Sequence, residues 1–211
     1  MTQPPFVTVD RAALVRRGLV LNYLTLGYNS VEAVVALVAG VVAGSVALVG
    51  FGLDSVIEVS ASVTAQWRLR VDVEPTRRAR AEHASHRLIG GSFLLLGIYI
   101  VIDSIRTLLG HQEPERSLPG LIILVLSVVV MPILARKKRI VATQLSSNAL
   151  RSEAKQTSLC AYLSAIALAG VALNAVLGWW WADPVAALVM VPIILQEGLE
   201  GVRTKRPAGG W

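Results

Sequence analysis

The sequence predicts an all-α integral membrane protein with six transmembrane helices. Of the 211 residues 54% are hydrophobic and 16% are charged, and the mean hydropathy is +0.60. Soluble domains carry about 25% charged residues, so this composition disfavours a soluble enzyme. The net charge of +6 does not indicate nucleic-acid binding, because the basic residues lie between long apolar stretches and form no common face. The single cysteine, Cys160, excludes an intrachain disulfide.

Six stretches are long enough to cross a bilayer, whose hydrocarbon core of about 30 Å needs roughly 20 apolar helical residues. Residues that favour turns separate them, such as Gly44 after the first stretch and Gly178 before the last. The predicted spans are Gly18–Ala43, Ser45–Trp67, Leu88–Leu109, Leu118–Ala135, Asn148–Gly178 and Trp179–Val202. The expected organisation is therefore an N-terminal tail (1–17), a membrane domain (18–202) and a short C-terminal tail (203–211).

The distribution of positive charge predicts the orientation. Of the 20 Lys and Arg residues, only Arg106 and Arg116 fall on the side opposite the two tails. Because cytoplasmic loops are enriched in Lys and Arg, both termini are predicted to be cytoplasmic and the protein to lie in the cell membrane. The basic run Arg136–Arg139 is assigned to the fourth connection, and the tryptophans Trp179–Trp181 to the outer interface.

Two acids on the second span form the strongest candidate site. Asp54 and Glu58 are four residues apart and so share one helical face, with no basic residue before Arg68. A carboxylate at mid-helix costs at least ~2.5 kcal/mol, and two such charges about 6 Å apart repel strongly unless a cation or a proton neutralises them. The pair predicts a site for a divalent cation or for protons. Permanently protonated acids that hydrogen-bond neighbouring helices are the alternative.

Other polar residues within the spans have simpler explanations. Asp103 is predicted to form a local ion pair with Arg106, and Asp183 to begin the sixth helix at the interface. A polar stripe on the first span either packs against other helices or lines an ion route; it consists of Asn22, Thr25, Asn29 and Glu32. Asn29 and Glu32 are accessory candidates for the ion site.

A second metal site is a candidate in the second connection, where an acid and two imidazoles lie together. Carboxylate and imidazole groups bind zinc. A solvated loop explains the same residues, which are Glu82, His83 and His86.

A weak internal repeat links the second and fifth spans. Ser45-Val46-Ala47-Leu48 and Ser147-Asn148-Ala149-Leu150 share the pattern Ser-x-Ala-Leu. When the two segments are aligned on these anchors, Asp54 corresponds in sequence to Gln156, Ser55 to Thr157 and Glu58 to Cys160. The two spans run in opposite directions, so the halves are expected to be inverted repeats, an arrangement that places ion sites at the interface of transporter repeats.

The strings Ser45–Leu48 and Leu53–Glu58 resemble the second transmembrane helix of the cation diffusion facilitator family, and Ser147–Cys160 resembles its fifth. Arg78–Ile100 is similar to the entry into helix three and Asp183-Pro184 to the start of helix six. The resemblance implies a homodimeric exporter that exchanges a divalent transition metal for protons. Its ligand positions correspond to Asp54, Glu58, Gln156 and Cys160, where Glu replaces an Asp of helix two and Gln and Cys replace the usual His and Asp of helix five. The family's C-terminal cytoplasmic domain has no counterpart in these 211 residues.

These four donors also suggest which cargo the site takes. Two carboxylates, an amide oxygen and a thiolate suit Zn first, with Fe(II), Co or Cd as alternatives, whereas a protonated thiol admits Mn. Glu153 is expected to substitute for a ligand or relay protons, and a water-filled cavity along the fifth span to connect Gln156 with the deeper acids. The expected partners are the metal, protons, the bilayer and a second copy, with no resident cofactor. The alternatives are a non-transporting scaffold or metal sensor, and a proton-coupled exporter of small organic cations.

Overall fold

Six α-helices account for nearly all of the computed structural model, which describes residues 11–70 and 75–203 apart from the side chains of 11, 64–86, 148 and 149. All six are long and apolar enough to cross a membrane, which confirms the predicted fold class. The helices are α1 (Arg11–Ala43), α2 (Val46–Arg70), α3 (Pro75–Leu109), α4 (Leu118–Leu145), α5 (Asn148–Leu177) and α6 (Ala182–Arg203).

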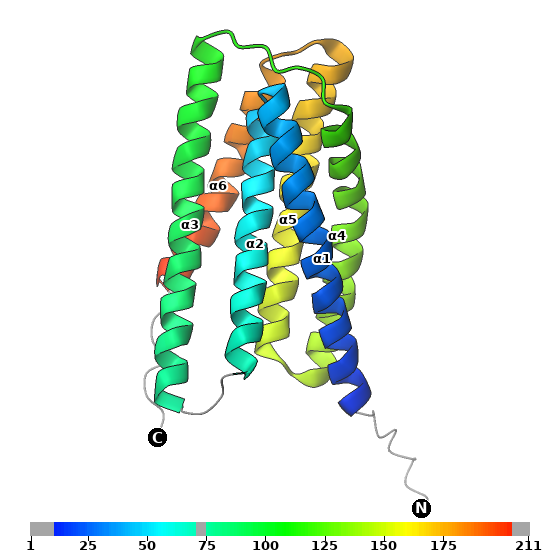
Figure 1. The fold of residues 1–211 in the computed structure, drawn as a ribbon, viewed down its shortest axis with the longest axis vertical. Coiled ribbons are helices and arrows are strands. Elements are labelled where there is room, and N and C mark those ends of the chain that lie inside the picture. Colours follow the sequence, from blue (N-terminus) through cyan, green and yellow to red (C-terminus); the bar gives the residue numbers. More distant parts are fainter. Residues whose placement is uncertain (1–10, 71–74, 204–211) are drawn as a thin grey trace, which may run out of the picture.

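The helices form one elongated bundle in which successive helices run in opposite directions (Figure 1). α1 packs against α2 and α4, α4 against α5, and α3 mainly against α6, while α2 also contacts α5. Fully buried side chains such as Phe51 and Met190 form the core, whereas many large apolar side chains, among them Val42 and Val176, are exposed on the outside. An apolar exterior of this kind suits a bundle surrounded by lipid.

Two helices extend well beyond their predicted spans. α3 begins at Pro75 instead of Leu88, and α4 continues past Ala135 to Leu145. Arg and Lys are good helix formers, so a helix continues where the apolar stretch ends. The basic run Arg136–Arg139 is therefore helical, which corrects its assignment to a connection.

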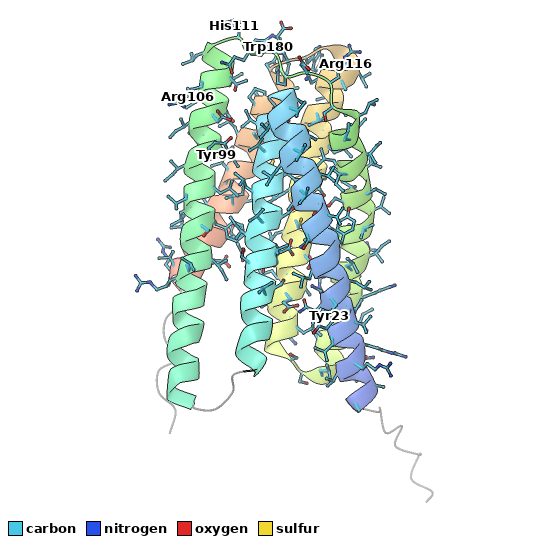
Figure 2. The ribbon with its side chains drawn as sticks, viewed as in Figure 1. Tyr23, Tyr99, Arg106, His111, Arg116 and Trp180 are labelled. Carbon is cyan, nitrogen blue, oxygen red and sulfur yellow. The ribbon has the colours of Figure 1, made fainter. Side chains whose placement is uncertain are left out.

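The tryptophans Trp179–Trp181 precede α6 and do not form its first turn. The rings of Trp179 and Trp181 stack with centroids 5.3 Å apart, and Trp180 lies 5.3 Å from the ring of His111. Trp180 and His111 lie at the same end of the bundle as Arg106 and Arg116 (Figure 2). Which membrane side this end faces stays a prediction.

The turn between α1 and α2 depends on two glycines. Gly44 has a φ of +63°, a left-handed conformation that glycine adopts without strain. The backbone N–H of Ser45 then donates to the Gly40 carbonyl at 2.9 Å, and the Ser45 hydroxyl accepts from the Leu48 N–H at 3.1 Å. A Cβ added to Gly40 would lie 2.8 Å from the backbone nitrogen of Val49, so glycine lets the two helices approach closely.

The turn between α4 and α5 repeats this geometry at the opposite end of the bundle. Ser146 has a φ of +51°, and the N–H of Ser147 donates to the Ala142 carbonyl at 3.0 Å. The Ser147 hydroxyl caps α5 by accepting from the Leu150 N–H at 3.4 Å. The two serines that anchor the sequence repeat thus occupy the same position in two equivalent turns, which supports the inverted repeat.

The two acids assigned to local structural roles have other partners. Asp183 begins α6 as expected but is buried, and its carboxylate accepts from the N–H groups of Val46 (2.9 Å) and Ala47 (3.3 Å) and from the Ser45 hydroxyl (2.5 Å). It therefore caps α2 and joins that helix to α6.

The prediction of an ion pair between Asp103 and Arg106 is wrong. Both residues are described, and no ion pair joins them; the Asp103 carboxylate instead accepts a hydrogen bond from the Tyr99 hydroxyl at 3.1 Å. Tyr99 lies four residues before Asp103 on the same helical face and competes successfully with the exposed Arg106. Figure 2 labels Tyr99 and Arg106 along α3.

Candidate metal-binding site

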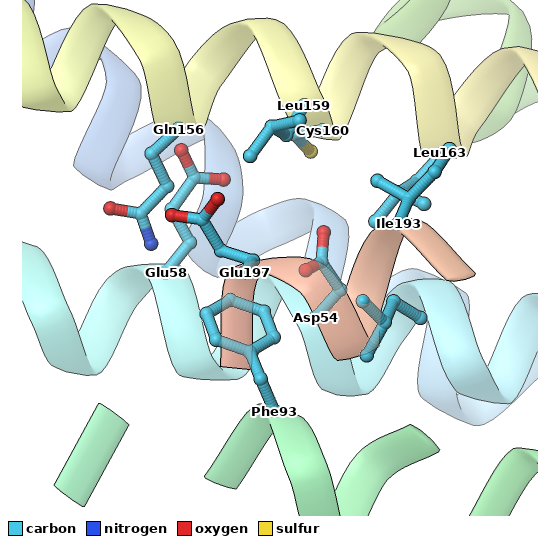
Figure 3. Close-up of a pocket in the computed structure, with 10 residues that line it drawn as sticks. Asp54, Glu58, Phe93, Gln156, Leu159, Cys160, Leu163, Ile193 and Glu197 are labelled. Carbon is cyan, nitrogen blue, oxygen red and sulfur yellow. The ribbon is translucent and has the colours of Figure 1, made fainter. Parts of the chain in front are cut away.

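α2 carries Asp54 and Glu58 into the interior of the bundle. Their exposed fractions are 5% and 3%, so neither acid faces lipid. Their spacing of one helical turn aims both carboxyl groups at the same region, between α2, α5 and α6 (Figure 3). The sequence prediction required this inward orientation.

α5 contributes Gln156 and Cys160 to the same place. A single pocket is lined by Asp54, Glu58, Gln156 and Cys160, together with Phe93 of α3 and residues of α5 and α6. Its free volume is about 10 Å³, room for about one water-sized guest. The structure therefore brings the four predicted ligand residues around one small buried space.

The opposite directions of α2 and α5 determine which residues face each other. In Figure 3 Glu58 lies beside Gln156, and Asp54 lies toward the Cys160 end of the pocket. Because α2 and α5 are in direct contact, Gln156 lies at the same level of the bundle as the acids of α2. The pocket that α5 lines has room for about one water, and a water-filled cavity along that helix stays a prediction.

The thiol of Cys160 points toward α1 in this structure. Its Sγ–H donates to Oε2 of Glu32 at 3.9 Å, and the Ser55 hydroxyl donates to the same oxygen at 3.2 Å. Among the described residues, no group of three or more His, Cys, Asp or Glu side chains is close enough to share one metal ion. The donors are gathered but do not form a closed coordination sphere in this conformation.

The accessory candidates on α1 contact residues of the site from outside the pocket. Glu32 is fully buried, and Asn29, 1% exposed, lies beside the Glu58 carboxyl. Neither lines the pocket. The polar stripe of α1 therefore points into the bundle, next to the acids of α2, which leaves both of its sequence-based interpretations open.

Glu153, the remaining accessory candidate, is held by a residue that the sequence analysis assigned to a loop. Lys138 of α4 is 1% exposed; its Nζ lies 3.6 Å from Oε2 of Glu153 and donates to the Thr157 hydroxyl at 3.3 Å. A signal for this burial exists, because Lys138 falls at helical spacing between the buried residues Leu134 and Ala142. This spacing was missed in the sequence because Lys138 lies within a run of four basic residues.

A third acid, Glu197 of α6, lines the pocket and was not anticipated. It forms an ion pair with Lys155 of α5, with Oε2 3.4 Å from Nζ. A carboxylate near the end of a span, close in sequence to Glu200, is typical of a solvated helix end, so the sequence offered no sign that Glu197 reaches the site.

The proposed second metal site falls in a helix rather than in a connection. Glu82, His83 and His86 lie within α3, but their side chains are outside the described residues. A zinc site there stays a prediction.

Comparison with known proteins agrees with this architecture. Residues 23–206, which include all the pocket residues, match the cation efflux transmembrane domain. The chain is 25% identical over 174 residues to the uncharacterized transporter sll1263 of Synechocystis, which is 79% of this chain and 56% of that protein. It is 25% identical over 173 residues to magnetosome protein MamB of Paramagnetospirillum magneticum (79% and 58%), and 28% identical over 141 residues to transmembrane protein 163 of Xenopus laevis (64% and 48%). The chain spans about half the length of these curated relatives.

The domain match covers most of the chain, and the six-helix bundle has the expected architecture. The match also includes both helices that carried the sequence resemblance. The chain therefore belongs to the cation efflux family, a family of transporters, and it corresponds to the transmembrane domain of that family.

Proposed function

We propose that this chain forms the membrane domain of a transporter that exports a divalent transition metal in exchange for protons. The observation that carries the proposal is that Asp54, Glu58, Gln156 and Cys160, named from sequence alone, line one buried pocket. Two carboxylates in such a pocket repel each other unless a cation or protons neutralise them. A metal ion and protons are therefore natural alternative occupants.

The donor set favours zinc among the candidate cargoes. Carboxylate oxygens, an amide oxygen and a thiolate suit a tetrahedral borderline ion better than Mg²⁺ or Ca²⁺, which take oxygen ligands in larger numbers. The pocket volume of about 10 Å³ favours a bare ion over an organic cation. An organic cation is larger than this pocket, so its binding would require the helices around the pocket to move apart.

Proton exchange follows from the chemistry of these ligands. Carboxyl groups and a thiol lose protons when they bind metal and regain them when it leaves, so a pH gradient drives export. The inverted repeat provides a means of alternating access, by rocking one half against the other around the site. We extend the proposal to a homodimer in the cell membrane with both termini cytoplasmic.

Vesicles reconstituted with the purified protein test this proposal. A pH-sensitive dye inside the vesicles is expected to report proton movement when Zn²⁺ is added, with Fe(II), Co, Mn and Cd as the comparison panel. Asp54→Asn is expected to abolish the signal, because it removes one of the two pocket carboxylates contributed by α2. Asp103→Asn is the matched control, since Asp103 lies in a span but contacts Tyr99 and not the pocket.

The outcomes separate the three functions. Zn²⁺-dependent proton flux that is lost in Asp54→Asn and kept in Asp103→Asn supports the transporter. Metal binding without flux supports the scaffold or sensor. Proton movement with small organic cations alone overturns metal export.

A further inference from the structure

Lys138 lies near the proposed site without being part of the pocket. Its ammonium group is almost completely buried, between Glu153 and Thr157 of α5. A buried ammonium carries a large desolvation cost, so its charge must be matched by nearby acids. Glu153 provides one match at 3.6 Å, with an exposed side-chain fraction of 21%.

Glu58 is the other acid whose charge this ammonium influences, although the described ion pairs of Lys138 include Glu153 and not Glu58. Thr157 links the two residues, because it accepts a hydrogen bond from Lys138 at 3.3 Å and lies beside the Glu58 carboxyl. Thr157 has no exposed surface, so little water screens the interaction. The ammonium therefore pairs directly with an acid outside the pocket and contacts Thr157, the neighbour in sequence of the pocket residue Gln156.

The helix packing does not itself require a charge at this position. When the equivalent turns of the two halves are aligned, Lys138 corresponds to Ala36 and Glu153 to Phe51, both fully buried. The first half thus packs the same positions with apolar side chains. Buried ion pairs are often replaceable by apolar residues without loss of stability.

We infer that Lys138 is an internal counter-cation of the transport site. Its ammonium, paired with Glu153, adds positive charge near Glu58 and so competes with the metal for the negative charge of that carboxylate. The inference rests on the proposed function and adds a residue that sets the affinity of the site and speeds release. No proton transfer to or from Lys138 is involved.

The inference predicts effects of opposite sign for the two members of the ion pair. Lys138→Met removes the competing charge, so the Zn²⁺ dissociation constant falls about tenfold, the size expected for one charge at short range in a partly screened site. Glu153→Gln leaves Lys138 with Glu58 as its acid partner, so Zn²⁺ binding weakens. A purely structural role would impair binding in both variants.

The experiment measures Zn²⁺ binding by calorimetry on the purified full chain and, in parallel, Zn²⁺ flux into vesicles. Lys138→Met is expected to lower both the half-saturating Zn²⁺ concentration and the maximal flux, because a tighter site releases metal more slowly. Lys138→Arg keeps the charge and is expected to retain the wild-type dissociation constant within about threefold. Lys137→Met is the matched control, since Lys137 is the exposed neighbour on α4.

Each outcome bears on a separate claim. Tighter Zn²⁺ binding in Lys138→Met, with rescue by Lys138→Arg, supports the counter-cation. Normal binding by the wild type with unchanged or weaker binding in Lys138→Met overturns it while leaving the proposed function intact. Absence of Zn²⁺ binding by the wild type overturns metal export itself, and the counter-cation with it.

Discussion

The two halves of the bundle share a backbone design and differ in charge. The α1–α2 and α4–α5 turns each have a left-handed residue at the same position, Gly44 and Ser146, followed by a capping serine and equivalent backbone hydrogen bonds. At the equivalent hydroxyls, however, Ser55 donates to the acid Glu32, whereas Thr157 accepts from the base Lys138. The comparison teaches that each position in one half has an equivalent position in the other half. The side chain at each position determines what that half contributes.

The division of charge extends to the pocket. The first half provides two carboxyl groups, Asp54 and Glu58, and α5 provides an amide and a thiol; Glu197 of α6 adds a third carboxyl group, which forms an ion pair with Lys155. Under the proposed function, α2 would supply the charge that neutralises a divalent cation, and α5 the neutral donors that select among cations. Three pairs of substitutions compare the two halves, first at the pocket, then at the caps of the two turns and last at the approach of the helices.

The largest expected effect comes from exchanging a charged donor for a neutral one. Glu58→Gln is expected to weaken Zn²⁺ binding about 100-fold, because a carboxylate in a poorly screened site contributes far more to cation binding than an amide. Gln156→Ala removes a neutral donor and is expected to cost about tenfold. Calorimetric titration of both variants compares the halves directly, and equal losses would contradict the division of charge.

A smaller effect is expected at the carboxylate of Asp183, which caps α2 at the α1–α2 turn. Asp183→Asn is expected to destabilise the protein by about 2 kcal/mol, since charged hydrogen bonds are stronger than neutral ones. Ser147→Ala removes only the serine cap of the other turn and is expected to cost about 1 kcal/mol. Thermal unfolding in detergent measures both. A larger loss in Ser147→Ala would show that the extra cap contributes little.

The smallest effect concerns how closely the helices approach at each turn. Gly40→Ala places a methyl group 2.8 Å from Val49 of α2, so a loss of about 1 kcal/mol or more is expected from overpacking. The equivalent residue in the second half, Ala142, already carries that methyl group and is fully buried. The same unfolding measurement on Gly40→Ala and Ala142→Gly tests whether only the first turn demands glycine; an unaffected Gly40→Ala would show that it does not.

Sequence reasoning located the acids of α2 because their signal is local. Two carboxyl groups one turn apart in an apolar stretch share a face in any helix, and insertion energetics require that face to point inward. The same argument led to Gln156 and Cys160 through the repeat. The family resemblance and the six-span fold were confirmed by the domain match and the bundle.

Two residues were misplaced because their surroundings depend on contacts between distant segments, and a third because of a local choice of partner. Lys138 belongs to a run of four basic residues, and only the packing of α4 against α5 determines which of them is buried. Glu197 reaches the pocket because α6 approaches α2 at that level. Asp103 had two local partners within one turn, and side-chain geometry selected Tyr99.

The size of the pocket has a consequence for the speed of transport. A space of about 10 Å³ cannot admit a divalent ion together with its shell of coordinated waters, so the ion must be stripped before it enters. Mg²⁺ gives up those waters reluctantly. Discrimination against Mg²⁺ is therefore expected in the rate of entry as well as at equilibrium.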